Sequence, residues 1–264
     1  MEGRLGAPLT ICIPYEELLE NIRSSLSRPG LHTFGDFKAH SRKLAIAAGG
    51  PSLEDTWKRL DGDVAAVNGS LRFLRERDIT PWACGVLDPR PRMADVVDAV
   101  PGIFYFVSST VHPTVFDKLQ RAGCDIVLWH PSPWPTEFPE PALLVGGGTT
   151  MGLRWINLGY CLGYRRFDLH GLDSSYRDDK THAYPDGFDR DIVEVSGYRT
   201  SPNFMVQVLD YFELMKLYDK PEVDPVVMKV YGDGLLQHEC KRMVEAAKRG
   251  EAYHPCGAGD ARAP

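Results

Sequence analysis

The chain has 264 residues, of which 43% are apolar and 25% charged, the composition of an ordinary globular protein. Its net charge of −6 argues against nonspecific binding to nucleic acid or to an anionic membrane surface, because both need an excess of Lys and Arg. No apolar run approaches the roughly 20 residues that cross a bilayer, and the six cysteines include no C-x-x-C pair. We therefore expect a cytoplasmic protein without a membrane span, a zinc site or a disulfide framework.

The sequence of residues 1–42 predicts a helical extension that precedes the alternating strands and helices of the main domain. Pro14 opens a stretch in which apolar residues such as Leu18 and Ile22 recur at helical spacing. Pro29 and the following glycine end this helix, and a polar connector leads to the first apolar run.

Residues 43–200 predict a Rossmann-like α/β domain. Short apolar runs predict strands at 44–48, 63–68, 82–87, 102–107, 125–129, 143–145 and 166–169. The segments between them predict helices that start at 53, 70, 93, 113 and 151. This alternation is typical of parallel βαβ units, and the continuous apolar strands indicate a sheet that is covered on both faces. The predicted fold is therefore a doubly wound, mostly parallel sheet.

The remaining segments decorate this domain. Five prolines within 131–141 predict a loop over a sheet edge, because proline breaks helices and central strands. The polar stretch 174–191 follows a strand end and predicts a mobile active-site loop. Residues 201–250 predict two helices that pack on the domain, at 203–218 and 233–249, and residues 251–264 a disordered tail.

Three unusual turns follow predicted strands. They are Gly49-Gly50-Pro51-Ser52, Gly146-Gly147-Gly148-Thr149-Thr150 and Gly171-Leu172-Asp173. The carboxyl ends of parallel strands meet at one edge of a sheet, and ligands bind there. The coincidence of three such turns at this edge predicts a ligand site.

The first turn, Gly49–Ser52, joins a strand to a helix. Glycine permits close backbone approach, and free N–H groups at a helix start attract anions. The turn is therefore either a phosphate cradle or simply a tight turn in which Ser52 caps the helix, with Asp55 at the capping-box distance. It matches neither the G-x-G-x-x-G nor the Walker A pattern, so it supports neither NAD binding nor P-loop chemistry.

The second turn combines three glycines with the hydroxyls of Thr149 and Thr150. Gly147 and Gly152 have the Walker A spacing, but Leu and Arg stand where Lys and Ser/Thr belong, so a P-loop is excluded. The turn predicts either a cradle for phosphate, carboxylate or sugar hydroxyls, or close packing of a helix on a strand.

Two carboxylates and one histidine complete the candidate site. Asp173 and Asp88 each follow a predicted strand, where a carboxylate can bind Mg²⁺, bind a ribose hydroxyl or cap a loop. His182, in the polar stretch, is either a general base or a bystander. G-x-S-x-G and H-E-x-x-H motifs are absent, so the sequence gives no sign of a hydrolase.

The order of these motifs resembles a known family. The matching segments are Ala48-Gly49-Gly50-Pro51-Ser52-Leu53, Gly148-Thr149-Thr150, Leu158-Gly159-Tyr160 and His170-Gly171-Leu172-Asp173. Over roughly residues 43–185 they resemble the archaeal 6-hydroxymethylpterin diphosphokinase-like (MptE-like) family. They are also similar to bacterial sialyltransferases that use CMP-sialic acid, although Gly49 stands where those enzymes carry Asn.

The first resemblance implies a nucleotide-dependent transferase of the diphosphokinase type. ATP phosphates would lie on the Gly49–Ser52 turn, and Asp88 and Asp173 would hold Mg²⁺. A pyrophosphoryl group would then pass to a hydroxymethyl acceptor, mainly through positioning and charge neutralisation.

The second resemblance implies a glycosyltransferase with a CMP-sugar or another nucleotide sugar as its donor. Asn68 would contact the nucleotide, Thr149 and Thr150 the donor, and His182 would deprotonate the acceptor. A third alternative is a degenerate nucleotide-binding module without chemistry. The expected partner is a small-molecule or glycan acceptor, and not nucleic acid.

Overall fold

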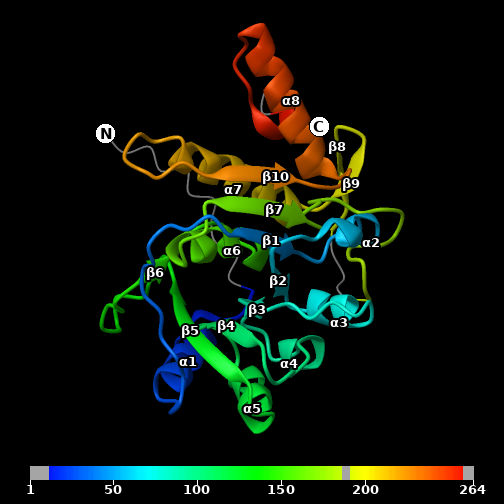
Figure 1. The fold of residues 1–264 in the computed structure, drawn as a ribbon. Helices are drawn as coiled ribbons and strands as arrows, with labels where there is room; N and C mark the ends of the chain where they lie inside the picture. The colour runs from blue at the N-terminus through cyan, green and yellow to red at the C-terminus, as the bar shows by residue number, and fades with distance from the viewer. Residues whose placement is uncertain (1–11, 186–190, 258–264) are drawn as a thin grey trace.

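An eight-stranded parallel sheet forms the centre of the computed structural model, which describes residues 12–185 and 191–257. The strand order is β10-β7-β1-β2-β3-β4-β5-β6, and each neighbouring pair is parallel (Figure 1). The strands are β1 (Lys43–Ala47), β2 (Asp63–Val67), β3 (Ala83–Val86), β4 (Phe104–Ser108), β5 (Asp125–Pro131), β6 (Leu144–Val145), β7 (Arg166–His170) and β10 (Val227–Val230). A separate antiparallel pair comprises β8 (Val193–Val195) and β9 (Tyr198–Thr200).

Helices cover both faces of the sheet. They are α1 (Tyr15–Leu26), α2 (Leu53–Thr56), α3 (Ser70–Arg75), α4 (Met93–Val96), α5 (Pro113–Arg121), α6 (Met151–Cys161), α7 (Pro202–Tyr218) and α8 (Leu235–Arg249), with short 3-10 helices at Trp57–Arg59 and Pro255–Gly257. One core cluster joins the sheet to α2–α5 through Leu53, Leu71 and Phe116. The other joins it to α6, α7 and α8 through Trp155, Phe212 and Leu236. The predicted doubly wound, Rossmann-like arrangement is thereby confirmed.

The strand order reverses between β1 and β7. From β1 the chain adds strands in one direction as far as β6, and α6 then carries it back to the other side of β1. Strands β1 and β7 pair from Lys43–Arg166 to Ala47–His170, so they end side by side. The arrowheads of β7 and β10 point toward α2 in Figure 1. We call the carboxyl ends of β1 and β7, with the loops that follow them, the switch point; in open α/β sheets ligands bind at this place.

Helix α1 covers another part of the same edge. Its Asn21 donates hydrogen bonds to the carbonyl oxygens of Pro89 (3.2 Å) and Thr110 (3.0 Å), which follow β3 and β4. Ser25 donates to the carbonyl oxygen of Ser109 at 3.0 Å. Helix α1 therefore closes the carboxyl ends of β3 and β4.

The structure adds elements that the sequence pattern did not indicate. Strand β10 and the β8–β9 pair lie in segments for which we expected loops and helices only. Residues 251–257, expected to begin a disordered tail, contact the buried carboxylate of Glu239 through the Tyr253 hydroxyl (2.6 Å) and the Cys256 N–H (3.0 Å).

Parts of three predicted segments lie outside the described residues: 1–11 of the N-terminal extension, 186–190 of the polar stretch and 258–264 of the tail. Within the described ranges, no helix is long and apolar enough to span a bilayer.

Candidate functional site

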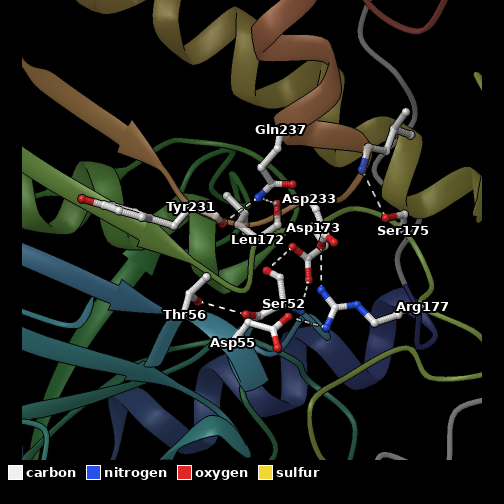
Figure 2. A network of polar contacts seen from close by, with 11 residues as sticks. Ser52, Asp55, Thr56, Leu172, Asp173, Ser175, Arg177, Tyr231, Asp233 and Gln237 are labelled. Carbon is white, nitrogen blue, oxygen red and sulfur yellow. Dashed lines mark hydrogen bonds and ion pairs between the residues drawn. The ribbon is translucent and has the colours of Figure 1, made fainter. Parts of the chain in front are cut away.

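The side chain of Asp173 lies at the centre of the switch point. It follows β7 and is 3% exposed. Its carboxylate accepts hydrogen bonds from the Ser52 N–H (2.7 Å) and the Ser52 hydroxyl (2.5 Å), as Figure 2 shows. Its backbone oxygen accepts from the N–H of Leu236 at 3.0 Å. Asp173 thus joins the turn after β1, the end of β7 and the first turn of α8.

Glycines make room for this carboxylate. A Cβ atom at Gly50 would lie 2.5 Å from Asp173 Oδ2, and one at Gly234 would lie 2.5 Å from the Asp173 backbone oxygen. Real Cβ atoms do not tolerate such distances to backbone or to a buried carboxylate. The glycine of the first turn that was predicted to admit a phosphate therefore admits an internal carboxylate in this structure.

Burial is the main influence on the pKa of the Asp173 carboxyl. Removal from water raises the pKa of its carboxyl to about 6, although the hydrogen bonds from Ser52 oppose that rise. The negative charge of Asp233 raises this pKa further, and the positive charge of Arg177 lowers it. A carboxyl with such a pKa can exchange a proton close to neutral pH, which is a property of general acids and bases.

Arg177 bridges two aspartates beside Asp173. Its guanidinium donates to Asp55 at 2.6 Å and to Asp233 at 2.7 Å (Figure 2). The Arg177 side chain is 31% exposed, and the two aspartates are 65% and 73% exposed. Exposed ion pairs contribute only about 0–1 kcal/mol each. Arg177 can therefore exchange either partner for an anionic ligand at little cost.

Sequence reasoning missed both Arg177 and Asp233. Arg177 lies in a stretch without periodicity, so nothing in the pattern placed it beside Asp173. Asp233 follows β10, a strand that was not predicted. The sequence Gly232-Asp233 did carry a signal, because a glycine and an aspartate after an apolar run also mark the end of β7, at Gly171 and Asp173.

Residues 180–184 cover the first turn. The N–H of Ala183 donates to the carbonyl oxygen of Gly49 at 2.9 Å. The ring of His182 packs against Gly49, and the ring of Tyr184 packs against both Gly49 and Gly69. His182 is thus at the switch point, as predicted, and rests on the turn itself.

The predicted capping box of the first turn is not formed, because the Ser52 side chain makes no capping hydrogen bond. Asp173 instead accepts the Ser52 N–H, and Asp55 pairs with Arg177.

Hydrogen bonds through α7 connect the second turn, Gly146–Thr150, to the switch point. The N–H and hydroxyl of Thr149 donate to Asp210 at 2.8 Å and 2.9 Å. Gln207 donates to the Thr150 hydroxyl and accepts from the Ser174 hydroxyl, each at 2.8 Å. A chain of hydrogen bonds therefore runs from the second turn to the neighbour of Asp173.

Both turns lie at one end of the sheet, as predicted. A Cβ atom at Gly152 would lie 3.4 Å from the Ala48 side chain and 2.8 Å from that of Leu172, so the start of α6 packs directly on the ends of β1 and β7. Gly148, in turn, packs against Leu153 and Asp210. Close helix–strand packing is therefore one role of this turn.

Asn68 lies beside the site, at the end of β2. Its backbone has the unusual φ of +49°, and its Oδ1 is buried without a hydrogen-bond partner among the described residues. Such an acceptor is costly to leave unpaired. The adjacent Gly69 contacts Tyr184, which places Asn68 next to the covering segment.

Asp88 does not join Asp173. Its carboxylate accepts from the backbone N–H of Arg90 (3.0 Å) and from Arg90 Nε (2.8 Å). Three strand spacings of about 4.8 Å separate β3 from β7, and α1 covers the edge near β3. Nowhere in the described part of the chain do three or more His, Cys, Asp or Glu side chains converge as metal ligands. The residues therefore do not fit a magnesium ion shared by Asp88 and Asp173.

Three helices begin at the switch point. At the start of α2, Asp173 accepts from the Ser52 N–H, and at the start of α8, Ser175 Oγ accepts from the Leu235 N–H at 3.1 Å. Asp210 accepts from the Thr149 N–H, two residues before α6. Helix N-termini are electropositive and favour anions. The carboxylate of Asp173 thus occupies a position that would suit an anionic ligand.

The raised pKa of Asp173 makes a stability prediction. The folded chain keeps this proton up to about pH 6, whereas the unfolded chain releases it near pH 4. The folded state binds more protons in that window, so the contribution of Asp173 to stability falls as pH rises from about 4 to about 6. Relative to Asp173→Asn, the wild-type free energy of unfolding should fall by about 2–3 kcal/mol across this window, measured by urea denaturation.

Asp78→Asn provides the control, because this exposed aspartate has a φ of +58° that asparagine also tolerates. It should follow wild type at every pH. A constant difference between wild type and Asp173→Asn from pH 4 to pH 7 would contradict the assignment.

Comparison with known proteins finds a similar solved fold and a matching family. The solved structure of the MAf glycosyltransferase from Magnetospirillum magneticum AMB-1 matches with a TM-score of 0.57 and 14% identity, over 92% of this chain and 42% of that one. At this identity the likeness concerns the fold, and the chain spans about two fifths of that protein. No curated protein matches the chain. The family model for 6-hydroxymethylpterin diphosphokinase MptE-like proteins matches residues 16–179, more than half of the chain, including the first turn and Asp173. The chain therefore belongs to the MptE-like family.

Proposed function

We propose that the chain is a nucleotide-dependent transferase that binds its donor at the switch point. The observation that carries this proposal is the convergence of the Gly49–Ser52 turn, Asp173 and Arg177 with three helix N-termini at the reversal of strand order. Membership in the MptE-like family supports a nucleotide-related transferase in general. The fold shared with a glycosyltransferase agrees with it.

The donor phosphates would replace internal partners rather than enter free space. Arg177 would exchange Asp55 and Asp233 for phosphate oxygens, which a guanidinium binds through two parallel hydrogen bonds. Residues 180–184 would move from Gly49, because their side chains now cover the turn. A donor hydroxyl or amino group would then satisfy the buried Oδ1 of Asn68.

On the evidence of the family, the first candidate reaction is pyrophosphoryl transfer from ATP. The hydroxyl oxygen of a hydroxymethyl acceptor attacks the β-phosphorus, the bond from that phosphorus to the bridging oxygen of the α-phosphate breaks, and AMP leaves. The proton of the hydroxyl passes to a base, for which we propose His182. Asp173 acts from beneath the turn by holding Ser52 in place.

The second candidate is glycosyl transfer from CMP-sugar or another nucleotide sugar to a glycan. The specific observation in its favour is that Asp88 and Asp173 lie apart, so this pair does not supply the shared magnesium site that the diphosphokinase resemblance implies. In this reaction His182 would take the proton of the acceptor hydroxyl, and the nucleotide would leave with the bonding electrons of the sugar.

Thermal denaturation with different nucleotides separates these candidates. A ligand present at 100 times its Kd stabilises the folded state by about 2.7 kcal/mol. A rise in Tm with ATP and Mg²⁺ but not with CMP or UDP supports the diphosphokinase, and a rise with CMP or UDP supports the glycosyltransferase. Binding without transfer to any acceptor indicates a non-catalytic module. No rise with any of these nucleotides would contradict the proposed site.

Arg177→Ala should reduce this rise in Tm, because the variant lacks the cation that binds phosphate. Arg249→Ala is the matched control, since Arg249 also forms an exposed ion pair, with Glu251 at 2.8 Å, but on the last turn of α8. It should respond to nucleotide as wild type does.

His182→Gln tests the proposed base. Loss of a general base lowers turnover by about 10²- to 10⁴-fold, and we expect nucleotide affinity to change little because the ring makes no phosphate contact in this scheme. Steady-state kinetics with the nucleotide that raises Tm gives both quantities. Turnover should survive in His254→Gln, which alters an exposed histidine near the C-terminus. Full turnover in His182→Gln would remove His182 from the mechanism.

A further inference from the structure

An open cavity of about 550 Å³ lies at the amino ends of the strands, opposite the switch point. Its walls come from residues 37–42 before β1, from Trp82 before β3 and from Tyr164 before β7. Strand β1 alone spans about 16 Å at 3.3 Å per residue. This amino-edge cavity is therefore separate from the candidate transferase site.

Aromatic rings form much of the wall. Phe37 is 55% exposed, although its backbone N–H is fixed to the carbonyl oxygen of Cys161 at 2.7 Å. The rings of Tyr164 and His40 meet edge to face at 4.5 Å, and Trp82 packs against Phe106 at 5.7 Å. These contacts hold the rings of Tyr164, His40 and Trp82 in place, and the exposed ring of Phe37 adds a flat apolar face beside them.

Two buried nitrogens at this cavity have no hydrogen-bond partner within the described residues: Trp82 Nε1 and His40 Nδ1. An indole N–H can only donate, and because the Trp82 N–H is buried and unpaired, its environment is sensitive to a ligand that packs on the Trp82 ring. The other nitrogen of His40 lies 3.1 Å from the carbonyl oxygen of Leu162. Because a carbonyl only accepts, that nitrogen carries the proton, and Nδ1 is left as the unpaired group.

The charge of the wall is positive. Lys38 and Arg42 line the cavity, and no carboxylate does. Arg42 already pairs with Asp63 at 2.6 Å. Lys38 is exposed and forms no ion pair within residues 12–185 and 191–257. Its charge remains available to an anion.

We propose that the amino-edge cavity binds a small planar aromatic anion. The ring lies against Phe37 and Trp82, and the anionic group faces Lys38. The cavity lies at the amino ends of the strands and the switch point at their carboxyl ends, so this ligand is neither the donor nor the acceptor of the proposed transfer. The proposal is therefore independent of the proposed function.

The indole ¹H–¹⁵N resonance of Trp82 reports binding directly, and its absence from the spectrum of Trp82→Phe assigns it. The probe is 2-naphthoate, which has a flat ring and a carboxylate but no nucleotide. Titration should move the Trp82 signal in a saturable manner. Its neutral isostere 2-naphthalenemethanol should bind more weakly, and acetate, which lacks the ring, should leave the signal in place.

Variants test the two halves of the site. Lys38→Ala should weaken 2-naphthoate binding about threefold to fivefold, as expected for loss of one exposed ion pair, and Phe37→Ala should weaken it about twofold to tenfold through loss of stacking. Both residues are exposed, so the variants should fold. Lys241→Ala, an exposed lysine on α8, should bind as wild type does.

Equal affinity for the acid and the alcohol, unchanged affinity in Lys38→Ala, or a Trp82 signal that does not move would each overturn the proposal. Nucleotide binding at the switch point should be the same in wild type and Lys38→Ala, so the two sites are tested separately.

Discussion

The buried carboxylate of Asp173 is the constraint on which the switch point depends. A charge removed from water is tolerated only with hydrogen-bond partners, and Asp173 finds them in the N–H and hydroxyl of Ser52. Because Ser52 belongs to the turn after β1, these bonds hold that turn against the end of β7, whose pairing with β1 aligns the two strands. The Asp173 backbone oxygen extends the unit to α8. Turn, strand end and helix start therefore form one hydrogen-bonded block, to which Arg177 adds exposed ion pairs.

This block explains why the candidate site is closed in the structure and what the proposed nucleotide would have to displace. Electropositive helix N-termini favour negative charge nearby, and Asp173 supplies it at α2 and Asp210 just before α6. Phosphates would compete for the same positions, so binding must shift internal carboxylates or arrange the phosphates around them. The exposed partners of Arg177 are the easiest to exchange. The covering residues 180–184 are the next, because they rest on the turn through ring contacts and a backbone hydrogen bond.

Most of the fold was predictable because its strands are buried on both faces, which gives continuous apolar runs between residues 43 and 170. Strand β10 escaped because it lies at the sheet edge, where Val227 is exposed. The three turns were correctly placed at one end of the sheet. The side-chain contacts within these turns were not predictable. The contact between Ser52 and Asp173 joins residues far apart in the chain, and the distance between Asp88 and Asp173 depends on the strand order. Local sequence determines neither.

Hydrogen–deuterium exchange with and without nucleotide tests the central claim most directly, namely that the donor binds at the switch point. With the nucleotide that gives the larger rise in Tm, exchange should slow in peptides covering 49–56 and 171–177 and change in 180–185, where the covering segment moves. Peptides from 36–42 at the opposite edge, and from α5, should exchange as before. Saturation with nucleotide that leaves 49–56 and 171–177 unchanged, or that protects only other segments, would contradict the account.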